Sequence, residues 1–240
     1  DWRDANIIVG TLGNSKAIDS LAEMGAIDVS EIKDKWESFT VQENGGNLII
    51  AGSDKRGTIY GIYDFCEKIG VSPWKWWADV KPEKADELYI NLPKEGYTED
   101  EPSVQYRGIF LNDEYNLNQW STSMGDGNIN KETYEKIYEL ILRLKANTLW
   151  PAMHQYSNAF HLDAENAVLA DKYGIVMGSS HAEPLLRNNL GELYPYQQQW
   201  LADHPDKKLY INTKDDSGRS VSYMWTDHDG DGNAVDNKEF

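Results

Sequence analysis

The chain has 240 residues, enough for one large domain or two domains of ordinary size. Apolar residues make up 40% of it and no apolar run approaches the roughly 20 residues of a membrane span, so we expect a soluble globular protein with no membrane partner. The net charge of −17, without a Lys/Arg-rich run, argues against a nucleic-acid partner.

The first hundred residues predict a small α/β domain. Short apolar runs predict strands, and apolar residues at helical spacing predict helices. The strands are expected at 5–12, near 38–42, at 47–51 and at 88–93, and the helices at 15–25 and 58–69. The polar, acidic stretch 94–103 is the expected domain boundary, so that this N-terminal domain covers residues 1–98.

Residues 104–240 form the second predicted domain, in which the order of strands and helices differs from that of the first domain. Strands are expected at 104–111, 148–153 and 175–180, with helices at 131–146 and 164–173 between them. A long polar loop is expected after the first strand, and Asn130 is expected to cap the helix that follows. Alternation of strand and helix with such short connections predicts parallel βαβ units.

Polar residues follow the end of each of these three strands. They are Asn112, Asp113 and Glu114 after the first strand, His154 and Gln155 after the second, and His181 and Glu183 after the third. In a (β/α)8 TIM barrel these ends share one face, which carries the chemistry. Only three of eight strands are predicted, so we expect an α/β fold in which a small N-terminal domain precedes the first strands of an incomplete barrel.

Four longer motifs then stand out in chain order. They are "AGSDKRGTIYGIYDFCEKIGVSPWKWWADV", "VQYRGIFLNDE", "LILRLKANTLWPAM" and "DKYGIVMGSSHAEPLLR". Together they resemble glycoside hydrolase family 115, over about residues 45–190. The family contains xylan α-1,2-glucuronidases. The resemblance implies an N-terminal α/β domain, a TIM barrel, and an enzyme that removes (4-O-methyl)glucuronic acid from glucuronoxylan with inversion. It also implies no catalytic metal and action outside the cell or in the periplasm.

The candidate catalytic residues are the carboxylates Asp113, Glu114 and Glu183. Inversion needs one carboxylic acid and one carboxylate, roughly 6.5–9.5 Å apart. Adjacent residues of a strand point to opposite faces, so Asp113 and Glu114 are not expected to form that pair by themselves. We expect one of them to face the barrel mouth while the other holds loops.

The candidate substrate-binding residues are Asn112, His154 and His181 for hydroxyl groups, Trp150 for stacking on a pyranose face, and Lys55 and Arg56 for the uronate carboxylate. Each has a structural alternative: barrel-core packing for Trp150, and a surface turn that ties the two domains together for Lys55 and Arg56. Arg107 lies inside a predicted strand and is expected to form a structural ion pair.

The tail "DHDGDGNAVDNKEF" resembles the 12-residue calcium-binding loop of an EF-hand. Asp227, Asp229 and Asp231 match positions 1, 3 and 5, but position 12 is Lys238 instead of Glu. The pattern is broken, so we expect no cofactor and keep calcium as an alternative at these three residues.

The function predicted from the sequence is an inverting α-glucuronidase with glucuronoxylan as its partner. Two alternatives stay open: a hexosaminidase-like glycosidase, and a non-catalytic fragment that binds carbohydrate or calcium. Secretion or a periplasmic location is expected. The sequence leaves the oligomeric state open, a homodimer included.

Overall fold

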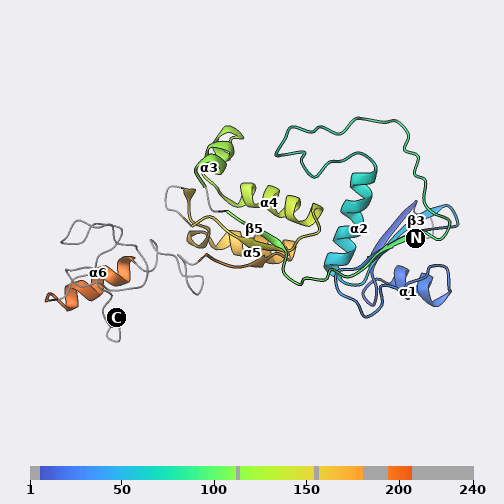
Figure 1. Cartoon of the computed structure of the whole chain (residues 1–240), viewed down its shortest axis with the longest axis horizontal. Coiled ribbons are helices and arrows are strands. Elements are labelled where there is room, and N and C mark those ends of the chain that lie inside the picture. Colours follow the sequence, from blue (N-terminus) through green and yellow to red (C-terminus); the bar gives the residue numbers. More distant parts are fainter. Residues whose placement is uncertain (1–5, 112–113, 154–156, 181–193, 207–240) are drawn as a thin grey trace. The chain divides into compact units, whose positions relative to one another are not determined.

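The computed structural model describes residues 6–111, 114–153, 157–180 and 194–206 (Figure 1). Contacts divide the chain into two compact units. The first unit takes in the chain up to Gly108 together with Glu135–Thr148 and Tyr173–Ile175. The second takes in Ile109–Tyr134, Leu149–Lys172 and the chain from Val176 onward. The predicted boundary between residues 98 and 104 stays a prediction.

A four-stranded sheet forms the centre of the first unit. Its order is β1-β3-β2-β4, where β1 is Ile7–Thr11, β2 is Phe39–Asn44, β3 is Asn47–Gly52 and β4 is Tyr97–Glu99. Strands β1 and β3 run parallel, while β2 is antiparallel to both β3 and β4. The predicted strands for β1, β2 and β3 are confirmed.

Two helices pack on opposite faces of this sheet. Helix α1, Lys16–Glu23, buries its apolar side in a cluster that contains Ile49 of β3. The next residue, Ile50, points to the other face, where it contacts Gly61 of helix α2, Lys55–Lys68. A Cβ atom on Gly61 would lie 2.6 Å from Ile50 Cγ2, so glycine lets α2 approach the sheet closely.

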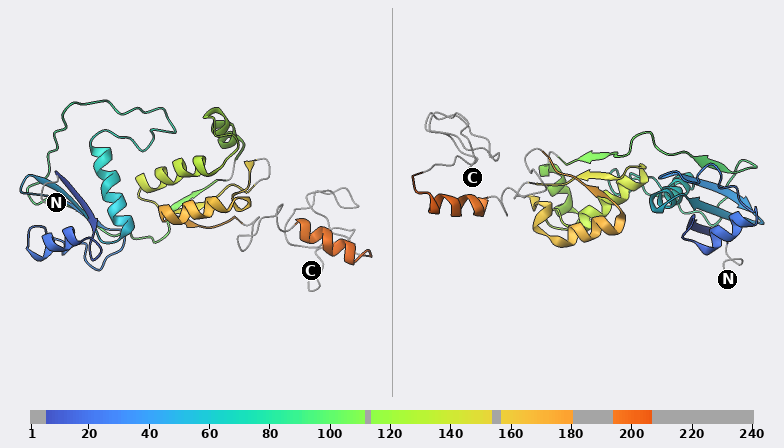
Figure 2. Two further views of the ribbon diagram at one scale, coloured as in Figure 1. Left: turned by 180° about the vertical axis from the view of Figure 1, so that it is seen from behind. Right: turned by 90° about the horizontal axis from the view of Figure 1, so that it is seen from below.

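The predicted strand at 88–93 is wrong. Figure 2 shows that the segment between α2 and β4 loops away from the sheet, and it holds no strand. Its apolar residues Leu88, Tyr89 and Ile90 are all exposed, Tyr89 by 89%. Strand β4 lies further along, inside the stretch that was predicted as a linker, because Thr40 and its neighbours on β2 supply its partners.

The second sheet has the order β5-β6-β7 and carries the predicted repeat. The strands are β5, Gly108–Phe110; β6, Thr148–Trp150; and β7, Val176–Met177. Thr148 N donates to Arg107 O and Leu111 N donates to Trp150 O, so β5 and β6 pair as parallel strands. Helices α4, Lys131–Arg143, and α5, Ala164–Tyr173, lie between successive strands in the chain. The predicted fold class, α/β with a strand–helix repeat after a small N-terminal domain, is confirmed.

The remaining elements are helix α3, Glu114–Ser123, a short 3-10 helix, Phe160–Leu162, and helix α6, Tyr194–Asp203. Helix α3 occupies the first part of the stretch predicted as a polar loop, so that prediction is wrong for Glu114–Ser123, while 124–130 holds neither helix nor strand, as expected. Among the described residues, no helix has both the length and the apolar character that crossing a membrane requires.

Candidate functional site

The segments that follow the three parallel strands are joined by hydrogen bonds in the second unit. Glu114, at the start of α3, accepts a hydrogen bond from Met153 N at 2.6 Å and another from Ser157 Oγ. Ser180, which comes after β7, donates from Oγ to Met153 Sδ at 3.0 Å. Residues from the carboxyl ends of β5, β6 and β7 therefore meet at one edge of the sheet.

Most residues predicted for the active site flank this cluster in the sequence but lie outside the described residues. They are Asn112, Asp113, His154, His181 and Glu183. The predicted calcium ligands Asp227, Asp229 and Asp231 also lie outside them. The roles of all eight stay predictions.

Glu114 is the one predicted carboxylate that the structure describes. Its side chain is fully buried, and its two oxygens bind the backbone and a hydroxyl of the segment after β6. Of the two roles expected for the adjacent carboxylates, this geometry favours the one that holds loops. Its catalytic role is untested.

Trp150 ends β6 and is 41% exposed. Its indole meets the ring of Phe110 on β5 edge-on, with centroids 5.3 Å apart and an interplanar angle of 66°. Trp150 is thus a partly exposed aromatic residue at the carboxyl edge of this sheet, and an indole has two flat faces. Such a face suits the apolar side of a sugar ring, and the stacking role of Trp150 stays a prediction.

Lys55 and Arg56 open helix α2 in the first unit. Arg56 forms an ion pair with Glu37, at 2.7 Å between Nη1 and Oε1, and donates from Nε to Gly174 O at 2.8 Å. The guanidinium of Arg56 thus takes part in the internal bonding of this unit. The uronate-binding role of both residues stays a prediction.

The sequence analysis missed Glu37, the centre of a polar network in the first unit. Its carboxylate, only 2% exposed as a residue, accepts from Arg56, from Arg107 Nη2 at 2.5 Å and from Asn147 Nδ2 at 2.8 Å. The structural ion pair predicted for Arg107 is confirmed, although this residue directly precedes β5. Glu37 has a left-handed backbone with φ of 52°, unusual for this residue type. No sequence pattern signals such a contact across 70 positions.

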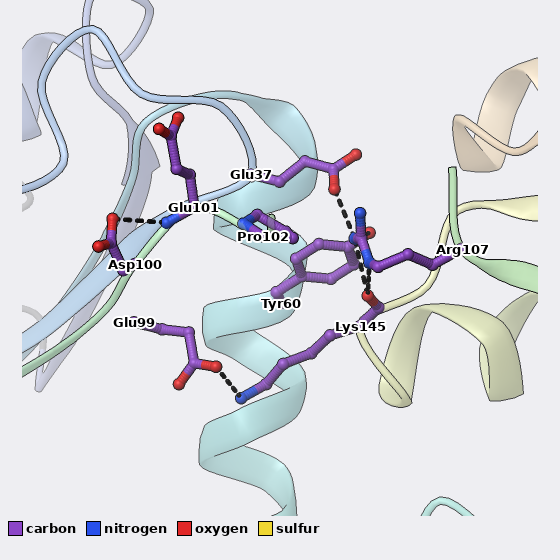
Figure 3. A pocket seen from close by; sticks show the side chains of 8 residues that line it. All are labelled: Glu37, Tyr60, Glu99, Asp100, Glu101, Pro102, Arg107 and Lys145. Carbon is purple, nitrogen blue, oxygen red and sulfur yellow. Dashed lines mark hydrogen bonds and ion pairs between the residues drawn. The ribbon is translucent and has the colours of Figure 1, made fainter. Parts of the chain in front are cut away.

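A cavity of about 300 Å³ lies beside this network (Figure 3). Its lining consists of Glu37, Tyr60, Glu99, Asp100, Glu101, Pro102, Arg107 and Lys145. Lys145 Nζ lies 3.4 Å from Glu99 Oε1. The guanidinium of Arg107 donates four hydrogen bonds to backbone oxygens: Nε and Nη2 donate to Lys145 O, and Nη1 donates to the oxygens of Val104 and Gln105. Burial, and then the charge of Glu37, raise the pKa of Tyr60. The charged groups here bind one another, which favours a structural role.

No group of three His, Cys, Asp or Glu side chains gathers as around a metal ion in the part of the chain that the structure describes. The described residues therefore contain no candidate metal centre.

The fold and the strand-end cluster together define a protein of parallel strand–helix units that gathers polar residues at the carboxyl ends of its strands. The family model of glycosyl hydrolase family 115 matches residues 99–225, more than half of the chain. The chain belongs to glycosyl hydrolase family 115.

A solved structure is also similar, with 46% sequence identity and a TM-score of 0.69. It is that of BtGH115A, described as a family GH115 4-O-methyl-α-glucuronidase with specificity for decorated arabinogalactans. The match covers 79% of this chain and 25% of that one, so the chain spans about a quarter of the length of BtGH115A. A search of curated proteins found no match.

Proposed function

We propose that the full-length protein is an inverting α-glucuronidase that removes (4-O-methyl)glucuronic acid side chains from glucuronoxylan. The observation that carries this proposal is the cluster of Glu114, Met153 and Ser180, which joins the strand ends in a chain of family 115. The similarity to a 4-O-methyl-α-glucuronidase supports the same reaction. A secreted or periplasmic location is part of the proposal, since the substrate is an extracellular polysaccharide.

In this proposal the residues beside the cluster do the chemistry. Asp113 and Glu183 are the candidates for the acid or the base, and the partner carboxylate can come from another strand of the barrel. Asn112, His154 and His181 bind substrate hydroxyls. Glu114 binds Met153 and Ser157 in the segment after β6, and His154 lies between these two residues in the sequence.

Decorated arabinogalactan is a second candidate substrate. The description of BtGH115A names this polymer, and the chain is 46% identical to that protein over the matched part. Both polymers would present the same terminal uronic acid, so the two candidates differ only in the backbone that the site must accept.

Incubation of the full-length protein with decorated xylan and with decorated arabinogalactan tests the proposal. We expect free (4-O-methyl)glucuronic acid from at least one polymer, and NMR of the first product should show the inverted anomer. The Asp113→Asn variant serves as the inactive control. Release from neither polymer would refute the proposed function, and release of N-acetylglucosamine from a glucosaminide would favour the hexosaminidase-like alternative.

A further inference from the structure

Gly178 follows β7 and lies beside the last residue of β6. Its N–H donates to Leu149 O at 2.9 Å, which aligns Gly178 with Trp150 on the neighbouring parallel strand. A Cβ atom built on Gly178 would lie 2.4 Å from Nε1 and 2.5 Å from Cδ1 of the Trp150 indole. Real Cβ atoms do not approach other atoms this closely, so the indole can keep its place only beside a glycine.

The indole of Trp150 is thereby held from two sides. Its pyrrole edge occupies the space that a side chain at position 178 would fill. Phe110 of β5 packs against the indole at 5.3 Å between ring centroids. The Trp150 residue still keeps 41% of its surface exposed. A large aromatic ring that is fixed in place loses little conformational entropy when a ligand stacks on it.

We propose that Trp150 is a stacking platform for a pyranose ring of the substrate and that Gly178 is the positioning residue that sets the orientation of its indole. The proposal rests on the proposed function, because it identifies the ligand as a sugar. The C–H face of a pyranose ring is apolar and flat enough to lie on an indole, and its hydroxyl rim stays free for polar side chains. Gly178 acts only through Trp150 and makes no contact with the sugar.

Three variants of the full-length protein test this inference: Gly178→Ala, Trp150→Ala and the double variant. Aromatic contacts of this kind contribute enough for a change of about three- to tenfold in affinity. We expect each single variant to weaken sugar binding by such a factor and to raise KM with kcat nearly unchanged, since stacking acts equally on the bound substrate and the transition state. In the Trp150→Ala background the steric conflict is gone, so adding Gly178→Ala should change neither affinity nor Tm further.

Calorimetry with D-glucuronic acid and with xylotetraose supplies the binding readout and identifies the ring that stacks. A selective loss for glucuronic acid assigns the platform to the uronic acid, and a selective loss for xylotetraose assigns it to the backbone. Trp74 is a tryptophan of similar exposure, at 45%, and serves as the control. The Trp74→Ala variant should leave both affinities unchanged. Gly61→Ala, whose Cβ atom would lie 2.6 Å from Ile50 Cγ2 in the first unit, controls for a general loss of stability and should show no coupling to Trp150.

Unchanged affinity for both sugars in Trp150→Ala would overturn the platform, most clearly if Tm fell at the same time, because Trp150 would then be a core residue of the complete barrel. Additive effects of Gly178→Ala and Trp150→Ala would overturn the positioning role of Gly178. The binding readout does not depend on hydrolysis. If the protein binds these sugars through Trp150 but releases no uronic acid, the proposed function fails while the platform stands.

Discussion

At the scale of single residues, two buried carboxylates organise the chain, one in each unit. Glu37 binds two guanidinium groups and an amide, and Glu114 binds a backbone N–H and a hydroxyl. A carboxylate removed from water is tolerated only when such partners replace its hydration. Neither residue stands in an apolar pattern, so hydrophobic periodicity cannot identify it. Glu114 was singled out in the sequence for its place after a strand, and the structure adds its burial and its partners.

The Glu37→Ala variant should lose about 3–5 kcal/mol of unfolding free energy. Arg56 and Arg107 would stay partly buried without their carboxylate, at side-chain exposures of 30% and 21%. Urea unfolding measures the loss. The exposed Glu31→Ala is the matched control and should change stability by less than about 0.5 kcal/mol. Equal effects of the two substitutions would contradict the role assigned to Glu37.

Substitution of Glu114 separates a loop-holding residue from a catalytic acid. Glu114→Ala leaves Met153 N without its acceptor and should cost about 1–3 kcal/mol. Glu114→Gln keeps an acceptor oxygen, so it should cost less and should leave both limbs of the pH–rate profile in place. Loss of one limb in Glu114→Gln would instead make Glu114 the titrating acid or base.

Asp64 in the first unit predicts a pH dependence of stability. Burial opposes ionisation of this carboxyl, but hydrogen bonds from Lys68, Tyr97 and Lys145 outweigh it, and the pKa of Asp64 is lowered. A lowered folded pKa gives stability that is complete above the unfolded value of about 3.9 and is lost as pH falls through the folded pKa. Asp64→Asn should therefore be destabilised at pH 7 and approach wild type in strong acid, as measured by urea unfolding. A deficit that is the same at every pH would contradict this explanation.

At the scale of elements, local sequence signals identify helices with apolar faces and miss those with polar ones. Helix α4 was predicted from its apolar stripe, and Asn130 caps it as expected, accepting from Thr133 N. Helix α3 was missed because its buried side consists of Glu114, Asn118 and Ser121, which bind polar partners in place of an apolar core. Long-range hydrogen bonds of this kind leave no periodic trace in the sequence.

Asp54 caps helix α2, which begins at Lys55, three residues before the predicted start at 58. Its Oδ1 accepts from Gly57 N at 2.7 Å and its Oδ2 accepts from Glu37 N at 2.8 Å. Asp54→Ala should cost about 1–2 kcal/mol in thermal or urea unfolding. The matched control is Ser15→Ala at the start of α1, where the side chain makes no capping hydrogen bond, so its cost should be smaller. The reverse order would contradict the capping role of Asp54.

At the scale of the whole molecule, the arrangement that the sequence predicted best is the parallel strand–helix repeat. Strands β5, β6 and β7 appear where short apolar runs alternate with helices, because each run is bounded by polar residues. The position of β4 and the strand expected at 88–93 were predicted wrongly, since sheet pairing depends on partners distant in the chain. The roles of Asp113, His154 and His181 stay predictions. Each of them is next in sequence to a member of the cluster of Glu114, Met153 and Ser180, whose hydrogen bonds are described above.

The central claim is that substrate binds at the carboxyl ends of β5, β6 and β7, and the most direct test is a crystal structure of the full-length protein with glucuronic acid bound. We expect the sugar in contact with the segments that follow these strands, and a ring face against Trp150 would assign the stacking platform to the uronic acid. A sugar seated only at a different place, such as the cavity lined by Tyr60, Arg107 and Lys145, would contradict the claim.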